Sequence, residues 1–317
     1  MRALQGYLRL GGFLALSALP AEGHAKAWFL QKPPPATQKQ KTSEERGVNP
    51  CASPDPGFGI YSPWNRGVSI GQMILPVHGG VSRTGEFDAM IHFHGHEPVR
   101  KEWVKVMDGA MLVGIDLGNG SGPYETTFAD KSNLTRLLTS IEQTVAAHTQ
   151  RKDVHLRRLG LSAWSAGYGA IQRILEDPAM RQRVDAVVLL DGLHCGYKPD
   201  SLNDLQLGPF MEFARLAAAG KKLMFVSHSS IIPPGYASTT ETANFLIDTL
   251  GGKAVRARPR GGDPMGLELI SQFSRGGFHV RGFSGNGKLD HCAQIGLYRD
   301  VLRIHIKPRW KSPRGTG

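Results

Sequence analysis

Apolar runs alternate with helically spaced apolar positions through the central part of the chain. Strand-like runs cover residues 87–93, 110–117, 156–163, 184–190, 222–227 and 278–283. Between two of these runs, apolar residues recur at three- and four-residue spacing, at Leu134, Leu137, Leu138, Ile141 and Val145. Further helices are expected over about 171–176, 210–219, 240–250 and 292–304. Strands that alternate with helices are typical of a mostly parallel sheet with helices on its faces.

The two ends of the chain have a different composition. Residues 1–25 carry Arg2 and Arg9, a short apolar run and then small residues, which is the pattern of a cleaved export signal. The run is too short to span a bilayer. Residues 26–57 are rich in proline and polar groups, which predicts a linker, and 307–317 form a basic tail. The sequence therefore predicts one α/β domain over 58–306 in an exported protein, periplasmic or secreted. An ordinary apolar N-terminal segment is the alternative to the export signal.

The formal net charge is +11. The positive charges are scattered among predicted turns, which favours a role in solubility and at most a weak attraction to anionic surfaces. Aromatic residues do not interleave with the basic ones, so the pattern argues against binding to nucleic acid. No cofactor is expected.

Ser165 is the strongest candidate for a nucleophile. It lies in the segment LSAWSAGYGA, where small residues stand two positions before it (Ala163) and two positions after it (Gly167). An apolar strand precedes this segment and a helical pattern follows it. A serine at a sharp strand-to-helix turn is presented to substrate, and the helix N-terminus favours negative charge beside it. The alternative is a serine in an ordinary strand-to-helix turn.

A nucleophilic serine needs a base and an acid that orients the base. His291, on a glycine-rich loop after the last predicted strand, is the candidate base. Asp191, at the end of strand 184–190, is the preferred acid, and Asp290 is the reserve. Asp116, after an earlier strand, is a further rival, while Asp191 could also be a helix cap or turn residue.

The order of strands, HFHGH, AWSAGYG, Asp191 and the final DH pair resembles the α/β-hydrolase superfamily over about 67–306. The resemblance implies a three-layer αβα sandwich whose mostly parallel sheet has roughly eight strands. It also implies an oxyanion hole formed by the N–H of Ala166 and that of Gly95 or His96. In most members the acid follows the next strand, where this chain has His228. A minority carry the acid one strand earlier, which would match Asp191.

Two other classes of protein remain open. The alternating histidines His92, His94 and His96 would face one side of a continuous strand and would suit a zinc hydrolase, so a metal site is the less favoured reading. A catalytically inactive binding protein with the same fold is the other alternative. The preferred reading is a serine hydrolase that cleaves a small-molecule or polymer-linked carboxylic ester, with amides and thioesters left open. Tyr124 and Trp164 are candidates for lining the substrate pocket, with a place in the core as the alternative for an aromatic residue beside the serine turn.

The chain has three cysteines: Cys51, Cys195 and Cys292. An exported protein meets an oxidising compartment, where disulfides form. Cys195 lies four residues after Asp191, and Cys292 directly follows His291, so a Cys195–Cys292 disulfide would join the acid loop to the histidine loop. Two buried free thiols are the alternative.

Overall fold

The computed structural model describes residues 54–257 and 266–310. The chain divides into two units, Met1–Lys32 and Pro33–Gly317, and every described residue belongs to the second. The predicted signal peptide and Cys51 lie outside the described residues. Among the helices of the described residues, none is both long enough and apolar enough to cross a membrane.

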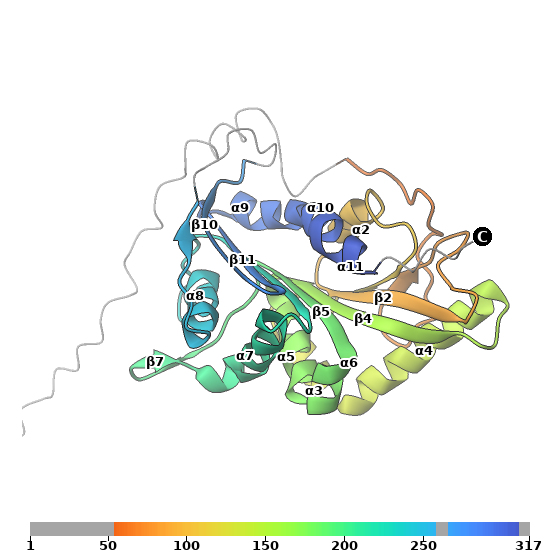
Figure 1. Ribbon diagram of the computed structural model, residues 1–317, viewed down its shortest axis with the longest axis horizontal. Helices are drawn as coiled ribbons and strands as arrows, with labels where there is room; N and C mark the ends of the chain where they lie inside the picture. The colour runs from red at the N-terminus through yellow and green to blue at the C-terminus, as the bar shows by residue number, and fades with distance from the viewer. Residues whose placement is uncertain (1–53, 258–265, 311–317) are drawn as a thin grey trace, which may run out of the picture. The chain divides into compact units, whose positions relative to one another are not determined.

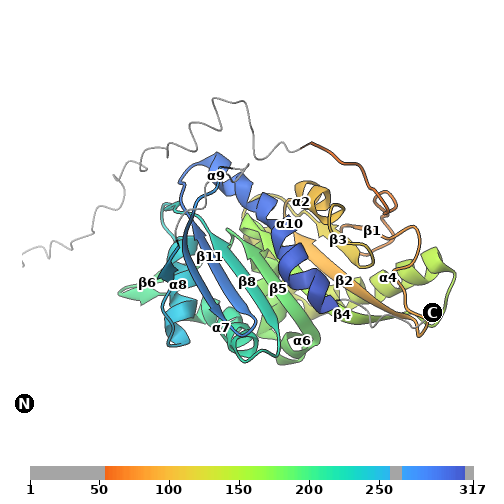
Figure 2. The ribbon, with the colours of Figure 1, turned by 45° about the horizontal axis from the view of Figure 1, so that its top comes forward.

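A mostly parallel sheet forms the centre of the fold (Figures 1 and 2). Within the described residues it has nine strands. The six central strands run parallel to one another, and β1, β10 and β9 pair antiparallel at the two edges. In spatial order the strands are β1 (Gln72–Ile74), β3 (Met111–Ile115), β2 (Glu86–Phe93), β4 (His155–Trp164), β5 (Val184–Leu190), β8 (Leu223–His228), β11 (Phe278–Phe283), β10 (Leu269–Arg275) and β9 (Val255–Arg256). The predicted α/β class with a mostly parallel sheet is confirmed.

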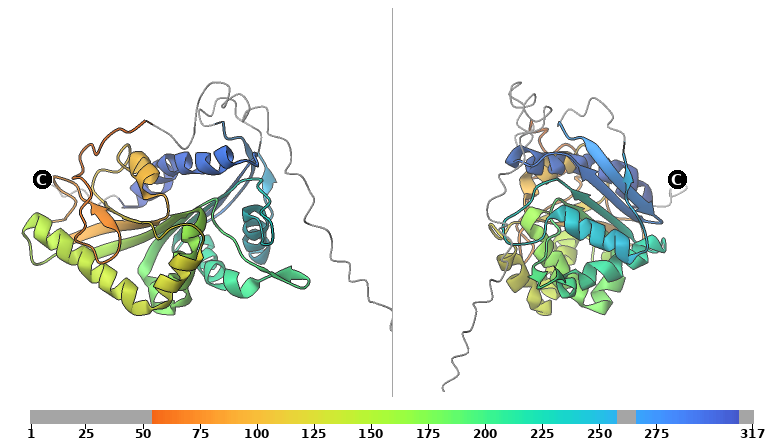
Figure 3. Two further views of the ribbon diagram at one scale, coloured as in Figure 1. Left: turned by 180° about the vertical axis from the view of Figure 1, so that it is seen from behind. Right: turned by 90° about the vertical axis from the view of Figure 1, so that its left-hand side faces the viewer.

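Helices cover both faces of this sheet, and Figure 3 shows the two layers from behind and from the side. One face carries α2 (His96–Trp103), α9 (Lys288–Ala293), α10 (Leu297–Val301) and α11 (Lys307–Trp310). The other carries α3 (Gly122–Ala129), α4 (Lys131–Thr149), α5 (Tyr168–Glu176), α6 (Pro178–Arg183), α7 (Asp204–Ala218) and α8 (Thr239–Thr249). A small hairpin of β6 (Tyr197–Lys198) and β7 (Ser201–Leu202) stands between β5 and α7.

Apolar residues of the sheet are buried toward both helical layers, which is why the central strands read as continuous apolar runs. Leu134, Leu137, Ile141 and Val145 of α4 are buried in one layer, as their spacing predicts. Trp103 of α2 is fully buried in the other layer, together with Tyr298 and Leu302. Full burial of such large side chains contributes roughly 1.5–3 kcal/mol each relative to exposure.

The folded part extends beyond the predicted boundary at residue 306. Lys307–Trp310 forms the last helical turn, and Trp310 is buried. Its indole Nε1–H donates to Asp185 Oδ2 at 2.8 Å, and Arg309 pairs with the same carboxylate. The predicted basic tail therefore contributes its first four residues to the fold, because the apolar side chain of Trp310 packs against the sheet.

Candidate functional site

The candidate site lies at the C-terminal ends of the central parallel strands. Ser165 follows β4, Asp191 follows β5, and His94 follows β2. His291 comes from α9, which follows the last parallel strand. Carboxyl ends of parallel strands share one edge, and this is where open α/β sheets place their ligands.

Ser165 sits in a strained turn between β4 and α5. Its backbone φ is +51°, in the left-handed region that non-glycine residues seldom adopt. A side chain at Gly167 would overlap the Phe93 carbonyl, and one at Gly192 would approach the Ser165 nitrogen to 2.6 Å. The close approach of Phe93, at the end of β2, therefore requires glycine at position 167. Strain of this kind costs about 1–3 kcal/mol and tends to mark functional positions.

Asp191 and His291 form a hydrogen-bonded pair. His291 Nδ1 lies 2.7 Å from Asp191 Oδ2. Because an ionised carboxylate only accepts hydrogen bonds, we assign the proton to His291 Nδ1, which leaves Nε2 as the nitrogen facing away from the acid. Asp191 Oδ1 accepts two more hydrogen bonds, from Ser229 N at 2.8 Å and from Thr239 Oγ1 at 2.7 Å.

The environment of Asp191 keeps its carboxylate charged. The side chain is buried, and burial alone would raise its pKa. The hydrogen bond and charge of His291, with the donors Thr239 and Ser229, outweigh burial and lower the pKa below its usual value. A charged Asp191 is suited to orient the His291 ring and to stabilise a positive charge on it.

The reserve acid, Asp290, is placed differently. Its Oδ2 accepts the backbone N–H of Gly287 at 3.0 Å and so closes the first turn of α9 in a capping arrangement. Asp290 is buried beneath Gly285, where an added Cβ would overlap its carboxylate. This geometry gives Asp290 a structural task at the start of the helix that carries His291.

Trp164, directly before Ser165, holds His291 from a second side. The indole Nε1–H donates to the His291 carbonyl oxygen at 3.0 Å, and the two ring centroids are 4.7 Å apart. The His94 ring stacks on the same indole at 5.2 Å, with 10° between the ring planes. Trp164 therefore fixes both the backbone and the ring of His291 beside the serine turn.

Asp116, after β3, organises the turn at 94–96. Its carboxylate accepts Gly95 N–H at 2.7 Å and contacts His96 through both the backbone N–H, at 3.4 Å, and the ring Nδ1. Burial would raise the pKa of Asp116, but the hydrogen bonds from His94, His96 and Gly95 lower it well below its usual range. The Gly95 N–H is already committed to Asp116, and the His96 N–H contacts the same carboxylate, which argues against either amide as the predicted oxyanion donor in this arrangement. The role of the Ala166 amide stays a prediction.

Tyr124, a predicted pocket residue, lies beneath this turn and has no exposed surface. Its hydroxyl accepts Leu117 N–H at 3.1 Å and lies 3.0 Å from His94 Nδ1. Tyr124 supports His94 from the protein interior, and the prediction that it lines a surface pocket is wrong.

The three alternating histidines do not converge. His92 is fully buried, with Nδ1 2.8 Å from Ser162 Oγ and Nε2 2.8 Å from the His94 carbonyl. His96 lies beyond the strand end, with Nε2 2.5 Å from Gln72 Nε2. Across residues 54–257 and 266–310 there is no group of three potential metal ligands.

The predicted Cys195–Cys292 disulfide is wrong. Cys195 is a buried free thiol, whereas Cys292 is disulfide-bonded. Cys195 packs into the core on the face covered by α7 and α8, while Cys292 belongs to α9 on the opposite face. Two cysteines beside paired catalytic candidates can thus point into different layers of the fold. The partner of Cys292 lies outside the described residues.

Thr239 and Ser229 are site residues that sequence reasoning missed. Thr239 is the first residue of α8, after the N-cap Ser238, whose side chain forms a capping box with Glu241. The Ser-x-x-Glu spacing predicts this helix start, but not that Thr239 faces Asp191. His228, at the end of β8, is buried and has Nδ1 2.8 Å from Thr240 Oγ1.

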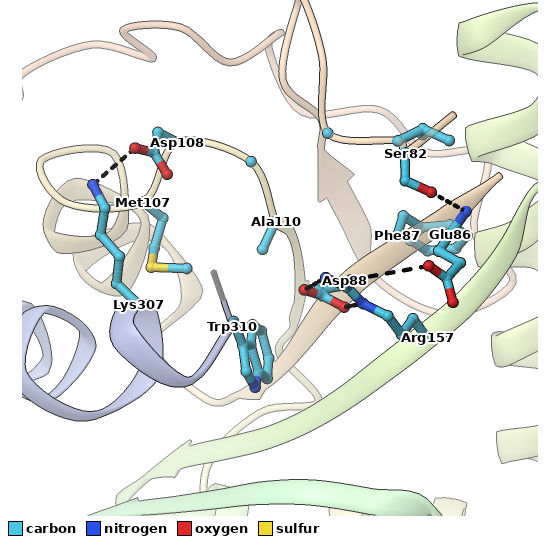
Figure 4. A pocket seen from close by; sticks show the side chains of 13 residues that line it. Ser82, Glu86, Phe87, Asp88, Met107, Asp108, Ala110, Arg157, Lys307 and Trp310 are labelled. Carbon is cyan, nitrogen blue, oxygen red and sulfur yellow. Dashed lines mark hydrogen bonds and ion pairs between the residues drawn. The ribbon is translucent and has the colours of Figure 1, made fainter. Parts of the chain in front are cut away.

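A separate cavity of about 350 Å³ lies at the opposite ends of the strands, near the residues where β2, β3 and β4 begin (Figure 4). Its cationic groups are paired: Arg157 with Asp88 at 2.7 Å and Lys307 with Asp108 at 2.8 Å. This cavity is distinct from the site built around Ser165.

No family model and no curated protein matches this chain. A solved structure of an uncharacterised protein from Capnocytophaga ochracea is similar over 72% of this chain, with 12% identity and a TM-score of 0.39. This chain covers 60% of that protein's length.

Proposed function

We propose that this protein is a serine hydrolase that cleaves carboxylic esters through an acyl-enzyme on Ser165. The observation that carries the proposal is the 2.7 Å hydrogen bond between His291 and buried Asp191, beside a serine held at φ +51°. Strained serine turns and carboxylate–imidazole pairs each occur in other settings. Their presence together at the ends of neighbouring strands supports the proposal, because serine catalysis needs a nucleophile, a base and an orienting acid close together.

The finer fold assignment belongs to this proposal. A serine after β4, an acid after the neighbouring strand β5 and a histidine after β11 follow the chain order of the α/β-hydrolase superfamily. The antiparallel pairing of β1 with β3 at one edge is compatible with that sheet. Members that carry the acid at the end of the strand next to the nucleophile strand provide the pattern for Asp191.

In the proposed reaction, the Ser165 oxygen attacks the ester carbonyl carbon. His291 Nε2 takes the serine proton, and the charge on the ring is balanced by Asp191 through Nδ1–H. The carbonyl oxygen becomes an oxyanion, which the N–H of Ala166 at the start of the helical turn would stabilise. His291 then returns the proton to the leaving alcohol, which departs and leaves the acyl group on Ser165.

The second half of the reaction repeats these steps with water. His291 removes a proton from water, and the oxygen attacks the acyl carbon. Collapse of the second tetrahedral intermediate breaks the bond to Ser165 and returns its proton from His291. The products are one carboxylic acid and one alcohol, and the enzyme regains its starting state.

The test combines covalent labelling with turnover. Wild-type protein is treated with a fluorophosphonate, and the modified residue is identified by mass spectrometry of peptides. A panel of esters with different acyl lengths is then hydrolysed by the wild type, by Ser165→Ala and by Ser69→Ala, in which an exposed serine outside the site is changed. We expect labelling at Ser165, loss of hydrolysis in Ser165→Ala and full activity in Ser69→Ala.

Two outcomes contradict the proposal. If the folded Ser165→Ala variant retains a tenth of the wild-type kcat, Ser165 is not the nucleophile, because loss of a triad serine typically costs several orders of magnitude. If the wild type is neither labelled nor active across the panel, the protein is a binding protein built on this fold. Circular dichroism of each variant establishes that it is folded.

A further inference from the structure

A row of aromatic side chains from three different segments lies next to the candidate site. The rings of Tyr168 and His194 are 5.7 Å apart and inclined by 67°. The rings of His194 and Tyr236 are 5.0 Å apart and perpendicular. These edge-to-face contacts are the favoured geometry of aromatic pairs. We call Tyr168, His194 and Tyr236 the aromatic row.

The aromatic row is tied to the catalytic candidates through the chain. Tyr168 is three residues after Ser165, and His194 is three residues after Asp191. Burial is the largest influence on the pKa of His194, and the charges of Asp191 and His291 also act on this pKa. Trp164 packs against His291, and the His94 ring stacks on the same indole. Aromatic residues therefore stand on both sides of Ser165 in the sequence, Trp164 directly before it and Tyr168 three residues after it.

Two backbone contacts hold the aromatic row in place. His194 Nδ1 donates to the Ala237 carbonyl oxygen at 2.9 Å, and Ala237 N–H donates to the Cys195 carbonyl oxygen at 2.9 Å. Thr242 Oγ1 adds a third link by donating to the Leu193 carbonyl oxygen at 2.7 Å. The loop that carries Tyr236 is thereby fixed against the segment after Asp191, so that little ordering is needed when a ligand binds.

Tyr236 nevertheless remains open to solvent. It is 44% exposed, and Ile232 in the same loop is 60% exposed, whereas the adjacent Ala237 is fully buried. Burial lowers the pKa of His194, which keeps the ring neutral at neutral pH and favours apolar contacts. A rigid, neutral aromatic surface with an exposed apolar neighbour suits a planar apolar group better than a charged one.

We propose that His194 and Tyr236 form a subsite that binds an aryl ring of the substrate, so that the preferred substrates are aryl-bearing esters. The inference rests on the proposed hydrolase function and adds the substrate class to it. An aryl ring at this subsite would extend the edge-to-face series that begins at Tyr168.

The test uses two matched pairs of esters, one for each side of the ester bond: methyl phenylacetate against methyl butanoate, and benzyl acetate against propyl acetate. For each pair, the aryl preference is the ratio of the two kcat/KM values. We expect a clear aryl preference in the wild type for at least one pair. Tyr236→Ala should reduce that preference about three- to tenfold, the factor expected for one aromatic contact, and Tyr236→Phe should keep it.

Tyr197→Ala is the matched control, since Tyr197 is a similarly exposed tyrosine (49%) on the nearby hairpin, where its hydroxyl contacts Glu241. Its aryl preference should equal that of the wild type. Absence of aryl preference in the wild type overturns the inference. So does an equal loss of kcat/KM for both members of each pair in Tyr236→Ala. Fluorophosphonate labelling of Ser165 in each variant shows whether the catalytic serine is intact.

A binding measurement separates this inference from the proposed function. Benzyl alcohol is titrated into the wild type, Tyr236→Ala and Tyr197→Ala while NMR shifts of the histidine ring protons are followed. We expect saturable binding that perturbs His194 and is weakened about three- to tenfold by Tyr236→Ala only. If no ester is cleaved but this result is obtained, the hydrolase proposal fails and the subsite stands. Equal affinity in all three proteins overturns the subsite.

Discussion

His291 Nδ1 lies 2.7 Å from Asp191 Oδ2, although the two residues are 100 positions apart in the chain. The contact joins the end of β5 to α9, which follows β11 in the chain, and β8 lies between β5 and β11 in the sheet. Ser229 and Thr239 bind the other carboxylate oxygen, so the acid is held from three directions. A carboxylate fixed in this way leaves the imidazole one preferred orientation.

The first prediction concerns the choice of acid. Asp191→Asn should lower kcat by roughly 10³- to 10⁴-fold with little change in KM, because the amide no longer favours the Nδ1–H tautomer of His291. Asp290→Asn should lower kcat less than about tenfold and reduce the melting temperature, since Asp290 caps the helix carrying His291. Steady-state kinetics and thermal unfolding measure the two effects. The reverse ranking in kcat would assign the acid role to Asp290.

The second prediction concerns Trp164 as a positioning residue. Trp164→Phe keeps an aromatic ring against His291 but removes the hydrogen bond to its carbonyl oxygen. We expect kcat to fall about two- to tenfold, as for the loss of one neutral hydrogen bond, with KM nearly unchanged. Trp164→Leu should cause a larger loss and move the acidic limb of the pH–rate profile, because His291 loses its ring contact.

Trp64→Phe is the control for this series. Trp64 contacts His96 and Glu97 and so perturbs the neighbouring turn without touching His291. Its pH–rate profile should superimpose on that of the wild type. Unchanged kcat and an unchanged profile in both Trp164 variants would show that the indole has no part in positioning the base.

The third prediction concerns thiol reactivity. Burial raises the pKa of the Cys195 thiol to about 11, so that the folded protein holds it protonated and inaccessible. Iodoacetamide at pH 8 should leave native protein unmodified at Cys195 and should alkylate it once the protein is unfolded without reductant. Peptide mapping should find Cys292 unmodified under both conditions. Recovery of alkylated Cys292 from unreduced protein would contradict the disulfide assignment.

The fourth prediction concerns stability in acid. Burial, followed by the charges of nearby His305 and Arg281, lowers the pKa of His279 to about 4, while an unfolded histidine titrates near about 6.5. Below about pH 6.5 the unfolded chain therefore binds this proton first, and the free energy of unfolding falls until about pH 4, where the folded form also binds it. Urea unfolding at several pH values in this window measures the decline.

His279→Asn should flatten this decline by up to one proton's worth of slope, since the group that titrates has been removed. The ring packs 4.3 Å from that of His305, and its Nδ1 contacts Ser274, so some loss of stability at pH 7 is expected as well. His78→Asn, at an exposed position, is the control and should leave the slope unchanged. Parallel curves for the wild type and His279→Asn would refute the assignment.

Periodicity determined the fold class in advance because it reflects which faces are buried. The apolar runs at 87–93 and 184–190 form parallel strands that are buried except at Asp185, and the apolar stripe of α4 packs into one layer. Short elements escaped prediction, among them β1 and the hairpin of β6 and β7. Runs of two or three residues carry too little pattern to separate a strand from a loop.

The sequence also located the serine turn, because Ala163-x-Ser165-x-Gly167 reflects a local constraint: the close approach of β2 leaves no room for a side chain at Gly167. Only the tertiary structure distinguishes Asp191 from Asp290. Asp191 contacts the His291 ring although it is 100 residues away in the chain, whereas Asp290, adjacent to His291 in sequence, caps the helix that carries it. The tertiary structure also shows that the Gly95 N–H donates to Asp116 and that Cys195 and Cys292 lie in opposite layers of the fold. The direction in which each of these side chains points is set by the packing of the whole sheet. The residues adjacent to it in the sequence do not encode that direction.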